Sequence, residues 1–283
     1  KNKTNEKKIA RPSTKTTDRL NMQSSKQADA GQISLATIIS KALLAGVMSI
    51  VLLGRSSSEA DEANPPNVVV FLVDDLGYMD IGANNPECFY ETPNIDALAK
   101  SGMLFTQHYS SAPVCAPARN MFLTGKHAGH AYIRSNSEWK ERGEVWNYIA
   151  MAKDSTLEGQ GPMPANTVTL ADNLKEVGYT TGIVGKWGLG APHTKSVPND
   201  MGFDFFYGYN CQRQAHQLYP KHLWKNKEKI WTDNDLVAPR QKLPEGADPM
   251  DPASYDMFNK QPDYAPALMQ TEALKFIDEN KDQ

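Results

Sequence analysis

Two adjacent aspartates, Asp74 and Asp75, are the first residues along the chain whose types and spacing could do chemistry. A divalent cation such as calcium is bound by several carboxylate and carbonyl oxygens, so an aspartate pair can supply part of a metal site. Aspartates that follow a strand are also common as solvated turn residues. The pair by itself leaves both interpretations open.

A second candidate centre is Cys115, which begins a C-x-P-x-R pattern completed by Pro117 and Arg119. A cysteine in this context can also be an ordinary buried thiol beside the start of a helix. The chain has three cysteines, too few for a disulfide framework, and no C-x-x-C pair offers zinc-like spacing. Cys88 and Cys211 could pair if the protein is exported, or remain two unrelated buried thiols.

The elements that position these residues begin with the apolar run 68–73 (VVVFLV), which is typical of a strand buried on both faces. Asp74 and Asp75 follow this run directly. Further on, Thr92-Pro93 predicts the start of a short helix that ends before Gly102, because threonine is a frequent N-cap and proline fits the first helical position.

Later segments repeat this alternation of helix and strand. Leu170, Leu174 and Val177 recur at helical spacing before Gly178, and residues 179–184 read as a strand that leads to Lys186. Such alternation predicts an α/β fold around a mainly parallel sheet, in which ligands gather beyond the carboxyl ends of strands. The polar candidates fall at those ends.

The C-terminal third of the chain shows less periodicity. Residues 199–266 are rich in proline, aspartate, lysine and aromatics, which predicts long surface loops, and residues 270–280 predict a helix. No closing strand follows that helix, so we expect the chain to be part of a longer domain.

Several segments together resemble the sulfatase family. The C-x-P-x-R pattern is continued by Leu-Thr-Gly at 123–125, NVVVFLVDDLGYMDIG at 67–82 looks like the family's opening strand, and GYTTGIVGKWGLG at 178–190 matches its second signature. The segment TPNIDALAKSGMLFTQHYS (92–110) is similar to the family's lead into the nucleophile. NCQRQAHQLYPKHLW (210–224) resembles the region that supplies an active-site histidine.

The resemblance implies an alkaline phosphatase-like α/β/α sandwich with a mainly parallel central sheet, of which residues 67–283 form the N-terminal part. It implies oxidation of Cys115 to formylglycine by a formylglycine-generating maturation enzyme, and Ca²⁺ binding by Asp74, Asp75 and residue 115. By the same resemblance, catalytic roles are expected for Cys115, Arg119, Lys186 and His216.

Two departures from the family pattern matter. The second signature normally has a histidine two residues after its lysine, whereas this chain has Gly188 there. The family also completes its metal site with an Asp-Asn or Asp-His pair and adds another lysine. Asp233-Asn234 reads as part of a loop without a preceding strand, and Asp172-Asn173 falls within a predicted helix. We therefore expect the C-terminal part of the catalytic domain to be missing and metal binding by this chain to be weak.

The function implied is hydrolysis of sulfate monoesters, on a sulfated small molecule or a sulfated glycan. The alternatives are a formylglycine-dependent phosphate or phosphonate ester hydrolase and a non-catalytic protein that binds sulfated glycans. The formal net charge of −3 provides no global basic field, so composition does not favour nucleic acid as a partner.

The N-terminal region predicts export. Residues 1–32 contain eight Lys or Arg against three acidic residues, and the apolar run 42–53 follows Lys41. Ser58-Glu59-Ala60 has the small alternate residues of a signal-peptide cleavage site, so we expect residues 1–60 to be a basic region with a signal, 61–66 a linker, and the product periplasmic or extracellular. The alternative is a membrane anchor through residues 33–54, which Lys41 makes less favourable.

Overall fold

The computed structural model describes residues 65–282 apart from 138, 140–141, 143–146 and 240. The predicted basic region, signal and cleavage site lie outside the described residues. The chain divides into two compact units, Lys1–Pro66 and Asn67–Gln283, and every described helix and strand belongs to the second. Within the described part of the chain, no helix combines the length and the apolar character needed to cross a membrane.

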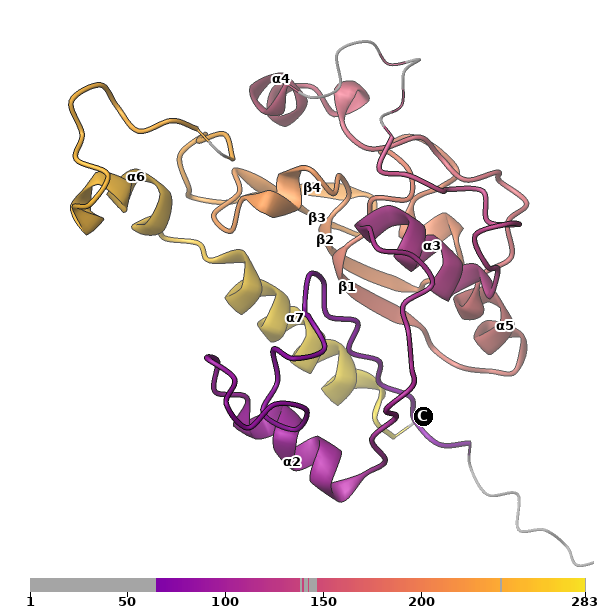
Figure 1. The fold of residues 1–283 in the computed structure, drawn as a ribbon. Helices are drawn as coiled ribbons and strands as arrows, with labels where there is room; N and C mark the ends of the chain where they lie inside the picture. The colour runs from indigo at the N-terminus through magenta and orange to yellow at the C-terminus, as the bar shows by residue number, and fades with distance from the viewer. Residues whose placement is uncertain (1–64, 138, 140–141, 143–146, 240, 283) are drawn as a thin grey trace, which may run out of the picture. The chain divides into compact units, whose positions relative to one another are not determined.

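A four-stranded sheet organises this unit, in the order β1 (Gly182–Lys186), β2 (Phe205–Tyr209), β3 (His222–Lys225) and β4 (Glu228–Trp231) (Figure 1). The first pair is parallel, with Lys186 opposite Tyr209, and the two later pairs are antiparallel. The parallel pairing joins the strand that carries a candidate site residue to its neighbour.

Helices cover both faces of the sheet, and the side chains of β2 alternate between these two faces. Phe206 packs on one face with Trp224 and with Leu123 of α3 (Cys115–Thr124), in a core that also contains Trp187. Tyr207 packs on the other face with the start of α7 (Ala265–Asn280). Figure 1 shows α3 and α7 on opposite sides of the strands. The helix, sheet, helix layering confirms the predicted α/β architecture.

The remaining helices are short. They are α2 (Pro93–Ser101), α4 (Tyr148–Lys153), α5 (Leu170–Glu176) and α6 (Asp256–Asn259), with 3-10 turns η2 (Ser155–Leu157), η3 (Pro198–Asp200), η4 (Gln214–His216) and η5 (Pro252–Tyr255). The Thr169 and Asp172 side chains cap the start of α5 reciprocally, and Gly178, at φ 92°, closes its end. The helices expected after Thr92, before Gly178 and over 270–280 are confirmed.

The strand predicted at 68–73 is not formed. The segment pairs with none of the four described strands, and its side chains are exposed, with Phe71 at 82%. An apolar run becomes a strand only where a neighbour satisfies its backbone groups and covers its side chains. The sequence signals the tendency of this segment, but no strand of the described residues pairs with it.

The prediction of long loops over 199–266 is wrong for part of that range, which contains β2, β3 and β4. These strands are only four or five residues long, and most of their aromatic side chains are buried because helices cover both faces of the sheet. Short aromatic strands separated by polar turns carry little periodic signal. The strand expected at 179–184 is present, shifted to 182–186.

Candidate active site

The adjacent aspartates lie on an exposed turn at the end of the segment 68–73. Asp75 has φ 55°, in the left-handed region that aspartate tolerates better than most residues because its short side chain can bond locally. This reversal of the backbone places the carboxylates of Asp74 and Asp75 next to Cys115 at the start of α3.

Helix α3 brings Cys115 and Arg119 to one face, because residues four apart lie one turn apart. Pro117 fits this first turn, where backbone N–H groups have no partner within the helix. The N–H of Ala116 instead donates to Oδ1 of Asn136 at 3.0 Å. The spacing of the C-x-P-x-R pattern therefore places Cys115 and Arg119 on the same face of α3.

Lys186 reaches the same point from the carboxyl end of β1. Its ammonium forms an ion pair with Oδ2 of Asp74, and Nη1 of Arg119 lies 3.8 Å from the same oxygen. Both cations are largely buried, with side-chain exposures of 14% and 11%. Burial lowers the pKa of Lys186, and it lowers the pKa of Arg119 to about 10, partly offset by the neighbouring Cys115. Arg119 therefore remains charged at neutral pH.

Two further groups hold the Arg119 guanidinium. Its Nε donates to the backbone carbonyl of Trp187 at 2.8 Å, and its Nη2 donates to Oε1 of Gln212 at 3.0 Å. Sequence reasoning did not identify Gln212 as a site residue. The one signal in the sequence was the unusual density of glutamines around His216. A glutamine that is buried normally needs a defined hydrogen-bond partner, so such a cluster can indicate a polar network.

The described residues beside Cys115 include carboxylates that can bind a divalent cation, but too few to complete its coordination. Ligand atoms of Asp74, Asp75 and Cys115 lie within 4.8 Å of one another. A thiol is a poor ligand for calcium, so the two aspartates supply the donor atoms of this group that calcium prefers. Calcium takes about six to eight oxygens, so these side chains provide only part of its coordination sphere.

His216 ends η4, and its side chain is exposed. It is not part of the group of ligand atoms around Cys115. The catalytic role expected for His216 stays a prediction. His193, which follows Gly188 in the same loop, is engaged elsewhere, with its Nε2 2.8 Å from Oγ of Ser155.

The structure decides whether Cys88 and Cys211 form a disulfide. Cys88 and Cys211 are both free thiols, and Cys211 accepts a hydrogen bond from Nε2 of Gln160 at 3.4 Å.

Asn234 follows β4 after two residues, so the predicted absence of a strand before Asp233-Asn234 is wrong. Its amide nevertheless donates to the carbonyls of Pro220 and Asp263, at 2.9 and 2.8 Å, within the protein. That pair of contacts makes Asn234 a structural residue.

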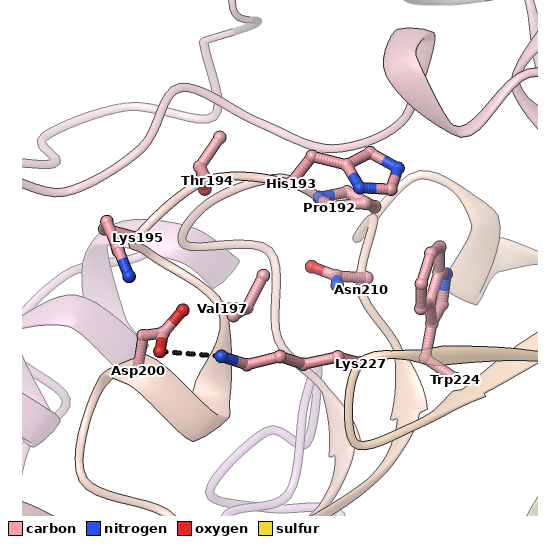
Figure 2. Close-up of a pocket in the computed structure, with 9 residues that line it drawn as sticks. All are labelled: Pro192, His193, Thr194, Lys195, Val197, Asp200, Asn210, Trp224 and Lys227. Carbon is pink, nitrogen blue, oxygen red and sulfur yellow. Dashed lines mark hydrogen bonds and ion pairs between the residues drawn. The ribbon is translucent and has the colours of Figure 1, made fainter.

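A pocket of about 270 Å³ lies near the loop after β1 (Figure 2). Its lining residues are Pro192, His193, Thr194, Lys195, Val197, Asp200, Asn210, Trp224 and Lys227. It shares no residue with the group around Cys115, and Lys227 and Asp200 within it neutralise each other at 2.7 Å. The group around Cys115 is therefore a separate site.

Several arylsulfatases and a steryl-sulfatase are similar to this chain in sequence. Human arylsulfatase D is 35% identical over 163 residues, covering 56% of this chain and 25% of the relative. Human steryl-sulfatase is 36% identical over 157 residues, covering 53% and 24%. Klebsiella aerogenes arylsulfatase is 33% identical over 181 residues, covering 63% and 35%. The chain thus spans about a quarter to a third of the length of these relatives.

Solved structures give a partial likeness. The crystal structure of Ps i-CgsB has 26% sequence identity and a TM-score of 0.48, covering 73% of this chain and 40% of that one. The PsFucS1 sulfatase from Pseudoalteromonas sp. has 23% identity and a TM-score of 0.47, covering 86% and 45%. The family model described as Sulfatase matches residues 66–283, which include every residue of the cluster. The chain belongs to the sulfatase family.

Proposed function

We propose that this chain carries the nucleophile side of the active site of a sulfate monoester hydrolase, with residue 115 converted to formylglycine. The observation that carries the proposal is that three segments distant in sequence place their side chains at one point. Segment 74–75, helix α3 and strand β1 are distant in sequence, yet they bring Cys115, two carboxylates and two buried cations together.

The charges suit an anionic substrate. A nucleophile that approaches the sulfur of a sulfate monoester is repelled unless positive charge lies nearby, and charge moves onto the leaving oxygen as the ester bond breaks. Arg119 and Lys186 provide two fixed cations beside residue 115. When bound by Asp74 and Asp75, calcium would add further positive charge against the sulfate oxygens.

The proposed reaction has two stages. A hydroxyl of hydrated formylglycine at position 115 attacks sulfur and gives its proton to a neighbouring carboxylate, which we assign to Asp75. The bond between sulfur and the ester oxygen breaks, its electron pair goes to that oxygen, and His216 protonates the departing alcohol. The second hydroxyl then loses its proton, the sulfate leaves, and the aldehyde is restored.

The substrate class proposed is a sulfated small molecule or a sulfated glycan, and the proposed location is the periplasm or the extracellular space. The basic N-terminal region, the apolar run 42–53 and the small residues at 58–60 support export. A formylglycine-generating enzyme is required as a maturation partner, because no residue of the described site supplies the oxidant.

The first test is the mass of the tryptic peptide 101–119, from the chain produced in a host that forms formylglycine. We expect the aldehyde at residue 115. In Cys115→Ala we expect no aldehyde and, in the protein with its whole catalytic domain, a loss of aryl sulfate hydrolysis of about 10³-fold or more. Cys88→Ala serves as the matched control and keeps both.

Two outcomes would contradict the proposal. An intact thiol at residue 115 would favour a non-catalytic protein that binds sulfated glycans. A faster reaction with aryl phosphate than with aryl sulfate, still dependent on Cys115, would favour a phosphate or phosphonate ester hydrolase.

A further inference from the structure

Gln212 is a buried glutamine in direct contact with the candidate active site. Its side chain is 4% exposed, and its Oε1 accepts the hydrogen bond from Nη2 of Arg119. Its backbone N–H donates to Oε1 of Gln160 at 3.0 Å. Gln160 is itself buried and anchored through its backbone to Gly190 at 2.9 Å. Gln212 is therefore a fixed acceptor.

The Arg119 guanidinium has a different partner in each direction. Nε is bound by the carbonyl of Trp187, Nη2 by Gln212, and Nη1 faces Asp74. A guanidinium is a rigid planar fork, so two fixed acceptors on Nε and Nη2 define its plane. That plane determines which N–H groups remain directed at Asp74 and residue 115.

Gly188 lies against the same pair of side chains. Its φ is 65°, and a Cβ built there would be 2.7 Å from Cβ of Gln212 and 2.8 Å from Nη2 of Arg119. Both distances are too short for normal contacts, and any side chain would also adopt a left-handed conformation. The space beside Gly188 is thus already occupied by Gln212 and Arg119.

We propose that Gln212 is a positioning residue that fixes the orientation of Arg119, and that position 188 must be glycine because the Gln212–Arg119 contact fills the space of a side chain there. The effect of Gln212 on catalysis rests on the function proposed above. The orientation of Arg119 does not rest on it and is measurable in chain that carries unmodified Cys115.

The test uses Gln212→Met, which keeps approximate side-chain volume but removes the acceptor, and Gln212→Glu, which keeps an acceptor oxygen. The readout is the ¹H–¹⁵N signal of Arg119 Nε and its rate of exchange with solvent. We expect exchange to accelerate about tenfold in Gln212→Met and to stay near the wild-type rate in Gln212→Glu. Gln217→Met changes another buried glutamine, one that binds Val237, and should leave the Arg119 signal in place.

Position 188 is tested with Gly188→Ala against Gly246→Ala. Gly246 also has a positive φ, of 82°, but has no atom within 4 Å of a built Cβ. Both variants bear the cost of a left-handed alanine, so only Gly188→Ala should displace the Arg119 signal. In the active protein, Gln212→Met and Gly188→Ala should each lower kcat about tenfold with a smaller change in KM, because orientation of Arg119 matters most as charge moves.

The outcomes separate the two proposals. An unchanged Arg119 signal in Gln212→Met, or equal displacement in Gly188→Ala and Gly246→Ala, overturns the positioning role. If the Arg119 signal responds as expected but a protein with the whole catalytic domain has no sulfatase activity, the positioning role is supported and the proposed function is contradicted.

Discussion

The two sides of the candidate site are built differently. Arg119 and Lys186 project from α3 and β1, whose surroundings include Trp187 and Phe206, both 0% exposed. Asp74 and Asp75 lie on an exposed turn that follows the unpaired apolar segment 68–73. The cations therefore belong to the packed core of the unit, whereas the carboxylates are attached to its surface.

The difference shows that the two cations, and not the carboxylates, set the geometry of the candidate site. Asp74 is held by its ion pair with Lys186 and by the nearby Arg119, rather than by packing of its own segment. Arg119 is held by backbone and side-chain contacts that do not depend on the aspartates. The cationic side of the site is therefore preorganised, and the position of the Asp74 carboxylate follows from it.

Truncation of one phenylalanine on each side gives the largest expected difference. Phe206→Ala removes a fully buried ring and should lower the free energy of unfolding by about 3–5 kcal/mol. Phe71→Ala, at a residue 82% exposed, should change it by less than about 0.5 kcal/mol. Urea unfolding followed by circular dichroism measures both, and equal losses would mean that segment 68–73 is packed in solution.

Arg119→Lys tests whether the packed side supplies geometry as well as charge. Lysine keeps the cation but cannot bind Trp187 and Gln212 as a planar fork, so we expect hydrolysis of aryl sulfate to fall about 10²-fold. Arg134→Lys is the control, because the hydrogen bonds of Arg134 go to the carbonyls of Ala131 and Gly129. Full activity in Arg119→Lys would reduce the role of Arg119 to simple charge.

Asp74→Asn tests the exposed side. We expect weak calcium binding, because the described residues offer only a few ligands, and we expect the affinity to fall about tenfold in this variant. One charged ligand is lost, and two neighbouring cations lose their counter-charge. Calorimetric titration with calcium provides the measurement, and Asp278→Asn, on the exposed surface of α7, is the control. Equal affinity in the two variants would remove Asp74 from the metal site.

Thr169→Ala gives the smallest effect and tests a local contact within the packed side. Thr169 forms the capping box of α5 with Asp172, so we expect a loss of about 1 kcal/mol in the free energy of unfolding. Thr271→Ala, in the exposed middle of α7, should be nearly neutral, because alanine has the higher helix propensity. A loss in Thr271→Ala as large as in Thr169→Ala would argue against a specific capping contribution. Urea unfolding resolves the difference.

Local patterns predicted the elements that are specified locally. The helices α2 and α5 begin and end beside the proline, threonine and glycine that marked them, and the spacing of Cys115 and Arg119 places both on one helix face. Segment 68–73 and strands β2 to β4 were predicted wrongly for a shared reason. Whether a short apolar segment becomes a strand depends on a neighbour that is distant in sequence.

The sequence by itself indicated the family of the chain and marked Asp74, Asp75, Cys115, Arg119 and Lys186 as candidate site residues, because each is marked by its type and its immediate neighbours. Only the tertiary structure decided that Gln212 holds Arg119 and fills the space beside Gly188. The contact joins residues 93 positions apart, and such a contact depends on how β1, β2 and α3 pack together. No local pattern carries that information, because a glutamine has the same side chain whether it is solvated or buried against a guanidinium.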